Sequence, residues 1–562
     1  MAYDFLEDLE DDLSDEELET LTHFDRDYKG SSQAIHDRLQ FQADFDIDLN
    51  LLNVQETHKR YQMDAYLFIP QAMGVNRDNF NRDQYYACMT NYMRIRTPSL
   101  SEESLNGHGP IPAASRYFQV HLLTHLRQQL EPLVVQEVKL FGCYLNTQLK
   151  KARTFLLDLL RKRPSNMSHR LQLLEKFLVR ILQSLSDYRL HYMHKVRHQA
   201  FLIDHEVRKA FLLVDEYFSY RLEATLIYMY QRLETEDHVL SRLLEAALSS
   251  EMEYRQHENL VQLQTHANES QRETYYYRLG LLKKYVSDVL YLQQENVRKD
   301  KAYRNLVAAA GAALAAFWAG LIDLQRFYWL NQPSQQQNAS DFGIRFFLIV
   351  VIGVVAYIFK DRIKEASREY FFERLKHHLP DFEFEMVYNH YDHQAQAAKD
   401  IKIGRTKQYM RFLQKNALPP EIHYIRELGH DIELDPERNE QIIHFSQSLL
   451  LDTQTIARNG QIHILRNILR WSIAPFLEKL DNPNKNMRYF DPQQGISMIK
   501  APKVYHVNVI FRYASVSQYK DEPLQGEQIE FERVRLILDK QGILRIEPVL
   551  PRGAMGYTEQ IA

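Results

Sequence analysis

The sequence predicts a mainly α protein, made of a cytoplasmic long-helix bundle or coiled-coil region, a two-helix transmembrane hairpin and a small C-terminal α+β domain with an antiparallel sheet. Three observations support this fold class. Residues 165–279 contain neither proline nor glycine, which is typical of long helices. Two apolar segments follow, at 306–322 and 346–359. The C-terminal part of the chain alternates apolar and polar residues, as half-buried strands do.

Composition narrows the function classes. The chain has 562 residues, enough for several domains, and its 45% hydrophobic and 25% charged residues are ordinary for folded protein. The net charge of -5 shows no basic excess, so we expect no nucleic-acid partner. With only Cys88 and Cys143, no disulfide framework can form, and a reducing compartment fits. No cofactor is predicted.

Residues 1–45 are predicted to form an acidic N-terminal tail. Ten of the first twenty residues are acidic, and the first Lys or Arg is Arg26, so this is no signal peptide. Phe5, Leu9 and Leu13 recur every four residues, which allows a weak amphipathic helix. Two interpretations remain open: a solvated tail, or a docking peptide for a basic partner.

Residues 46–114 are predicted to form a mixed α/β segment, with a strand in 64–75 that ends at Pro70 or Gly74. A cytoplasmic helical region is expected over 115–304, because its leucines recur at spacings of three and four. Turn signals within this region favour antiparallel helices.

Residues 381–562 are predicted to form the C-terminal α+β domain. The stretch DFEFEMVY (381–388) alternates like a strand, and a helical region is expected from about 404 to 480. The end of the chain predicts three strands, two of them joined by a hairpin turn at Asp539-Lys540-Gln541-Gly542.

The two apolar segments predict transmembrane helices at 305–330 and 342–359, joined by a short external loop at 331–341 and followed by a cytoplasmic helix at 360–380. The alternative is a buried helix of a soluble bundle. The connector holds only two basic residues, Arg326 and Arg345, whereas both outer flanks are basic. The flanking cations are Arg298, Lys299, Lys301 and Arg304 before the first segment, and Lys360, Arg362, Lys364, Arg368, Arg374 and Lys376 after the second. The positive-inside rule therefore predicts a multi-pass protein of the plasma (inner) membrane with both termini cytoplasmic.

The first apolar segment separates small from large side chains on a helical wheel. Ala308, Ala312, Ala316 and Gly320 form a ladder that predicts a helix-packing face, since small residues allow close backbone approach in lipid. Asp323 ends the same face, and Arg345 begins the second helix on the same side of the membrane. The two are predicted to form an ion pair across the hairpin.

Two histidine patterns are candidate metal sites. His191, His194, His198 and His205 lie on one stripe of a predicted helix, and the i, i+4 pair within it can chelate zinc. The alternative is a solvated polar stripe opposite the apolar face. Further on, His430-Asp431 resembles the His-Asp dipeptide of HD-type metal phosphohydrolases. The resemblance implies an earlier histidine, for which His390 or His393 stand at suitable positions, and a later aspartate, Asp452.

No phosphate-binding loop, nucleophile elbow or HExxH motif occurs in the chain. The sequence therefore predicts a non-enzymatic, two-pass membrane-anchored scaffold or sensor that assembles through helical packing, with the lipid bilayer and a second copy or another protein as partners. Two alternatives stay open: an oligomeric pore formed by the small face of the first span, and a metal-dependent, HD-like hydrolase in the cytoplasmic part.

Overall fold

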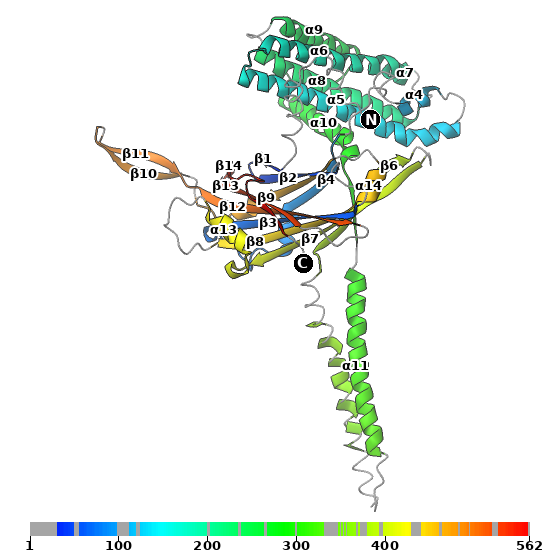
Figure 1. Cartoon of the computed structure of the whole chain (residues 1–562), viewed down its shortest axis with the longest axis vertical. Helices are drawn as coiled ribbons and strands as arrows, with labels where there is room; N and C mark the ends of the chain where they lie inside the picture. The colour runs from blue at the N-terminus through cyan, green and yellow to red at the C-terminus, as the bar shows by residue number, and fades with distance from the viewer. Residues whose placement is uncertain are drawn as a thin grey trace, which may run out of the picture.

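The structure is a computed structural model of the chain. It describes residues 31–49, 56–97, 112–119, 124–198, 203–233, 238–262, 267–297, 300–330, 379–392, 397–428, 440–459, 464–481, 484–493, 495–519 and 527–559, with short stretches between 347 and 370. Three parts follow one another along the long axis of the molecule: a bundle of helices, a pair of β-sheets, and the long helix α11 (Asp300–Leu330), which projects from the sheets (Figure 1).

The middle part contains a large and a small antiparallel sheet. The large sheet runs, in spatial order, β14 (Gly542–Leu550), β13 (Glu527–Asp539), β12 (Tyr505–Tyr519), β3 (Glu56–Pro70), β8 (Glu440–Asp452), β7 (Ala397–Leu413), β6 (Phe382–Asp392) and β5 (Gln293–Asn296), and β15 (Gly556–Glu559) pairs with β13. The small sheet runs β1 (Ser31–Asp37), β2 (Gln40–Asp48), β9 (Ile464–Ser472) and β4 (Met89–Ile95). Strands from both ends of the chain therefore share each sheet.

The two sheets pack face to face around an aromatic core. Strand β2 alternates buried and half-buried residues, so its apolar side chains point to one face. Phe41 of β2 stacks on Trp471 of β9, with ring centroids 5.7 Å apart, and Phe45 packs edge-on against Phe511 of β12 at 5.6 Å. The indole N–H of Trp471 donates to the Tyr85 hydroxyl at 2.7 Å, which satisfies the one polar group this ring brings into the core.

Short helices cover the edges and the outer face of this sandwich. They are α2 (Arg82–Cys88), α13 (Pro420–Glu427), α14 (Thr453–Asn459) and α15 (Ala474–Leu477). Ile422 and Ile425 of α13 are fully buried against the outer face of the large sheet. The buried Arg533 of β13 donates to the carbonyl oxygens of Ile425 and Leu428 at 2.7 and 2.6 Å, which satisfies the end of this helix.

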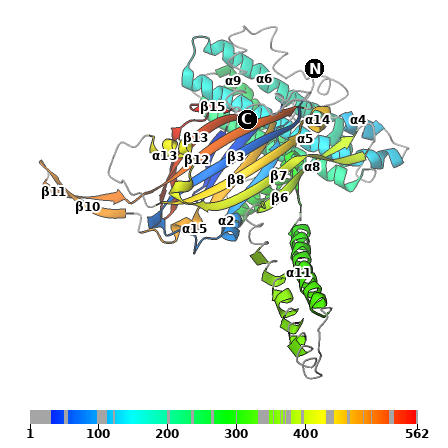
Figure 2. The same ribbon diagram turned by 60° about the horizontal axis from the view of Figure 1, so that its bottom comes forward.

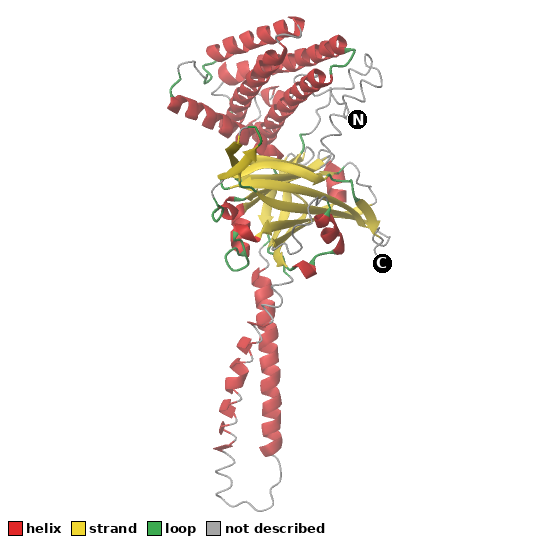
Figure 3. Cartoon of the chain, turned by 90° about the vertical axis from the view of Figure 1, so that its left-hand side faces the viewer, coloured by secondary structure: helices red, strands yellow, loops and turns green. Residues whose placement is uncertain are grey.

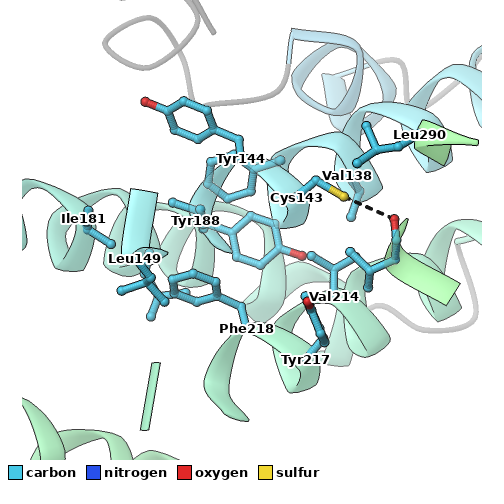
Figure 4. Close-up of a cluster of buried hydrophobic side chains, with 14 of the residues drawn as sticks. Val138, Cys143, Tyr144, Leu149, Ile181, Tyr188, Val214, Tyr217, Phe218 and Leu290 are labelled. Atoms are coloured by element: carbon cyan, nitrogen blue, oxygen red, sulfur yellow. Dashed lines mark hydrogen bonds between the residues drawn. The ribbon is translucent and has the colours of Figure 1, made fainter. Parts of the chain in front are cut away.

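The helical part is a bundle inserted between β4 and β5. Its helices are α4 (Pro112–Gln119), α5 (Thr124–Lys162), α6 (Met167–Tyr188), α7 (His194–His198), α8 (His205–Leu233), α9 (His238–His257) and α10 (Glu269–Ser287), with a π-helical turn at Arg189–Met193. Figure 4 shows Tyr188 packed among side chains of α5 and α8 at its centre. The Cys143 thiol donates to the Val286 carbonyl at 3.4 Å, and burial raises its pKa to about 12, so the thiol stays protonated.

Glu137 links α5 to α4 and makes the stability of the bundle depend on pH. Its carboxylate accepts the Ala113 N–H at 2.8 Å, and burial raises its pKa to about 7. Because the folded-state pKa lies above the unfolded value of about 4.5, the folded chain holds the proton longer, and stability falls as pH rises from about 4.5 to about 7. We expect Glu137→Gln to abolish this fall, worth up to about 3 kcal/mol, in urea unfolding followed across that pH range. The exposed Glu245→Gln variant, as control, should unfold like the parent at every pH, and an unchanged pH slope in Glu137→Gln would contradict the assignment.

The fold class predicted from the sequence is wrong, because the protein combines a helical bundle with a large antiparallel sheet. The region 404–480, predicted to be helical, contains most of β7 and all of β8 and β9. Strand β8 is buried on both faces, so its sequence does not alternate apolar and polar residues as a half-buried strand does. Its apolar residues recur instead at spacings typical of a helix. The structure also places β1 and β2 in the segment predicted as an acidic tail. The strands at 64–70 and 382–388 and the hairpin at Asp539–Gly542 are confirmed.

Candidate functional site

The most unusual feature of the molecule is the apolar helix α11, which projects from the body (Figures 1 and 3). Its segment Val307–Gln325 is long and apolar enough to cross a membrane, by length and composition, yet only 17% of it is buried. The apolar core helix of a soluble protein would be mostly buried. The interpretation of this segment as a buried bundle helix is therefore excluded for the described part of the chain.

Large side chains are exposed on α11 from Leu314 to Tyr328. Phe317, Leu324 and Phe327 keep 67%, 70% and 67% of their surface accessible. Removing one such side chain from water is worth about 1.5–3 kcal/mol, so leaving several of them in water is strongly unfavourable. An exposed apolar surface of this length marks a contact with lipid or with another protein.

The two-helix transmembrane hairpin predicted from the sequence is wrong as a description of this fold. Among the described residues, a single helix meets the length and composition of a membrane span. The described residues between 347 and 370 are helical and lie beside α11 (Figure 2), and no described stretch of them has the length of a membrane span.

Both ends of the insertion that carries α11 join the same edge of the large sheet. Strand β5 precedes α11 and pairs with β6, with Gln293 opposite Val387. The Val297 N–H donates to the Glu383 carbonyl at 2.9 Å, just before the chain enters α11. The chain therefore leaves the large sheet and returns to it at the same edge, and α11 is the first element of the insertion between these two points.

The predicted packing face of α11 is adjacent to the face that the structure covers. Ala312, Ala316 and Gly320 are exposed and Ala308 is half-buried, and a Cβ at Gly320 would meet nothing within 4 Å. The buried residues are instead Val307, Gly311 and Ala315. The two ladders differ by one position, or about 100° around the helix, because small residues occupy a broad side of α11. Asp323 is exposed, and its predicted partner Arg345 lies outside the described residues.

The histidine stripe lies on the surface of the bundle. His191 Nδ1 is 2.8 Å from the Asp187 carbonyl oxygen, and the rings of His194 and His198 lie 4.4 Å apart. His205 lies at the start of α8 and contacts Glu206 at 3.3 Å. In the part of the chain that the structure describes, no group of three or more His, Cys, Asp or Glu side chains could hold a metal ion.

The residues of the HD-like resemblance are placed only in part. His393, His430 and Asp431 lie outside the described residues. The Asp452 carboxylate is described, and it caps α14 by accepting the Thr455 N–H at 3.1 Å and the Thr455 hydroxyl at 2.8 Å. Asp452 thus has a local structural role at the end of β8.

A buried ionic network lies behind the histidine stripe, and sequence reasoning missed it. Arg189, in the π-helical turn, donates to Asp215 of α8 at 2.9 Å and to both oxygens of Glu251 of α9 at 2.8 Å. Asp215 also accepts the Tyr254 hydroxyl at 2.5 Å and Arg197 at 3.2 Å. Burial lowers the pKa of Arg189, but Asp215 and Glu251 outweigh this and raise it above its ordinary value, so the guanidinium stays charged.

A signal for this network was present in the sequence. Asp215 and Glu216 interrupt the apolar run AFLLVDEYFSY of α8, and charges inside such a run need partners when they are buried. Glu216 is held by Arg278 of α10 at 2.5 and 2.6 Å. The network therefore ties the π-helical turn, α8, α9 and α10 together through charged hydrogen bonds.

Comparison of the chain with protein-family models, with curated proteins and with solved structures gives no match.

Proposed function

We propose that the protein is a membrane-anchored scaffold or sensor, held in the plasma (inner) membrane by α11. One observation carries the proposal: an apolar helix of membrane-spanning length projects from a folded body with little of its surface buried. The helix begins at Asp300, far from the N-terminus, so it does not have the position of a signal sequence.

The pairing of β5 with β6 supports an arrangement with the body on one side of the bilayer. Because these two strands are neighbours in one sheet, the chain before α11 and the chain after Phe382 lie on the same side. The basic flanks of the insertion favour the cytoplasm for that side, since cytoplasmic loops carry the excess of Lys and Arg.

Protease treatment of inverted inner-membrane vesicles tests this arrangement. We expect the protease to digest the helical bundle and both sheets, which would face the outside of these vesicles, and to leave α11 in a protected fragment. Detergent should abolish the protection. Recovery of the whole chain in an alkaline carbonate wash, or protection of the body, would contradict the proposal.

The second part of the proposal is that the chain assembles with itself. The mass of the full chain in detergent tests this. A scaffold that assembles with itself should give a mass that is a multiple of 66.8 kDa after correction for detergent. A strictly monomeric chain at all concentrations would exclude self-assembly. The pore and hydrolase alternatives stay predictions, because no described feature favours either.

A further inference from the structure

The second exposed apolar feature is a two-stranded ribbon formed by β10 (Asn484–Asp491) and β11 (Gly495–Pro502). Among the described strands, these two pair with each other alone, from Asn484 opposite Pro502 to Asp491 opposite Gly495. The ribbon extends away from the sheets, across the direction of α11 rather than along it (Figures 1 and 2). It is therefore an arm of the body, separate from the helix that we assign to the membrane.

Both faces of the ribbon expose large apolar side chains. Residues directly opposite each other share a face, so Met487 and Ile499 lie on one face and Phe490 and Ile496 on the other. Phe490 and Ile496 keep 72% and 78% of their surface accessible, near the tip of the ribbon. An isolated two-stranded ribbon is only marginally stable in water, so a surface like this one fits a bound partner.

The ribbon is also basic. Lys485, Arg488 and Lys500 are exposed, and within the described residues no acidic group pairs with them. The acidic residue of the ribbon is Asp491, and its carboxylate accepts the Gln493 N–H at 2.7 Å in the turn. A partner that matches this arm combines carboxylates with large apolar side chains.

We propose that residues 3–13 of the same chain bind the β10–β11 ribbon. This segment, YDFLEDLEDDL, contains six carboxylates, no basic residue, and the apolar side chains Tyr3, Phe5, Leu6, Leu9 and Leu13. Its charge is opposite to that of the ribbon, and its apolar residues match the exposed faces. A second copy of the ribbon is a poorer occupant, because the two arms carry like charges that repel.

The chain is long enough to bring this segment to the ribbon. Ser31 pairs with Phe45 of β2, and Gln40 at the other end of β2 pairs with Ser472, from which the chain runs through α15 to Asn484. This path measures at most about 55 Å, and the straight line is shorter. The seventeen residues between Leu13 and Ser31 span up to about 55 Å when extended.

Cysteine crosslinking in the full chain tests the proposal. In a Cys88→Ser background, cysteines are placed beside the segment and on the ribbon with Ser14→Cys and Ser497→Cys, and a short bismaleimide is added. We expect a crosslinked product of monomer mass at a yield about five times that of a Ser14→Cys/Ser249→Cys control on α9, because binding raises the local concentration. Reversing the ribbon charges with Arg488→Glu and Lys500→Glu should bring the yield down to the control.

Matched variants separate charge pairing from chance contact. Arg272→Glu with Lys284→Glu makes the same change of net charge on α10 and should leave the yield unchanged. Equal yields at Ser497 and Ser249, or a yield that resists ribbon charge reversal, would overturn the proposal. A product that is mainly of dimer mass would overturn it as well, because the segment would then bind the ribbon of a second copy.

Discussion

Arginine at Leu314 and Phe317 is expected to release the full chain from the membrane. Both side chains are exposed on α11, near the middle of the segment Val307–Gln325. Replacing an apolar residue by arginine at the centre of a spanning helix costs about 3–4 kcal/mol, so the pair costs about 7 kcal/mol. The small-residue composition of α11 leaves little transfer energy to offset this. The measurement is the fraction of chain that resists extraction by alkaline carbonate.

A control for this experiment lies on the bundle. Tyr276 and Tyr277 of α10 are exposed by 78% and 68%, which is comparable to the α11 side chains. Tyr276→Arg with Tyr277→Arg should leave the chain in the membrane fraction, because we place these residues in water. If the α11 and α10 variants behave alike, α11 does not hold the protein in the membrane.

Arg189→Met is expected to cause the largest loss of stability within the bundle. The substitution leaves Glu251, which is 4% exposed, without its bidentate partner, and it removes one of the cations that hold Asp215. Breaking a buried ion pair from one side costs about 3–5 kcal/mol, because the remaining charge stays buried. Native-state hydrogen exchange should therefore show faster opening of α8 and α9 in this variant, with α11 unaffected.

Two further variants distinguish the network from ordinary surface pairing. Arg189→Met combined with Glu251→Met removes both charges and should be less destabilised than the sum of the single variants. Lys209→Met breaks the exposed pair with Glu206 and should destabilise the chain far less than Arg189→Met, because solvent screens this pair. Equal effects of Arg189→Met and Lys209→Met would show that the buried network contributes no more than a surface pair.

Local sequence pattern was sufficient to predict the helices and strands that are long or half-buried. The helices α6 to α9 lie in the proline- and glycine-free region 165–279, where leucines at spacings of three and four predict amphipathic helices whatever they pack against. The hairpin at Asp539–Gly542 was also predictable from the sequence. There, the Asp539 carboxylate accepts the Gln541 and Gly542 N–H groups at 2.7 and 3.1 Å, so the turn is built by residues next to each other in sequence.

Sequence pattern failed to predict strands that are buried on both faces, because such strands do not alternate apolar and polar residues. Strand β8 lies between β3 and β7 and is covered on both faces, so nothing in its own sequence distinguishes it from a buried helix. Local sequence pattern also failed to reveal the buried ionic network around Arg189. An arginine in a polar stripe looks solvated until the carboxylates of Asp215 and Glu251, 26 and 62 residues away, are placed beside it.

The sequence by itself determined that this chain contains a helical bundle, a C-terminal hairpin and an apolar helix of spanning length, because those features depend on residues within a few turns of each other. Tertiary structure alone decided that strands from both ends share two sheets, that β5 and β6 close the insertion of α11 at one edge, and that Val307, Gly311 and Ala315 are the covered face of this helix. These outcomes depend on which distant segments meet. The free energy that stabilises these contacts between distant segments comes from the apolar surface that they bury together, and a local sequence pattern does not contain that information.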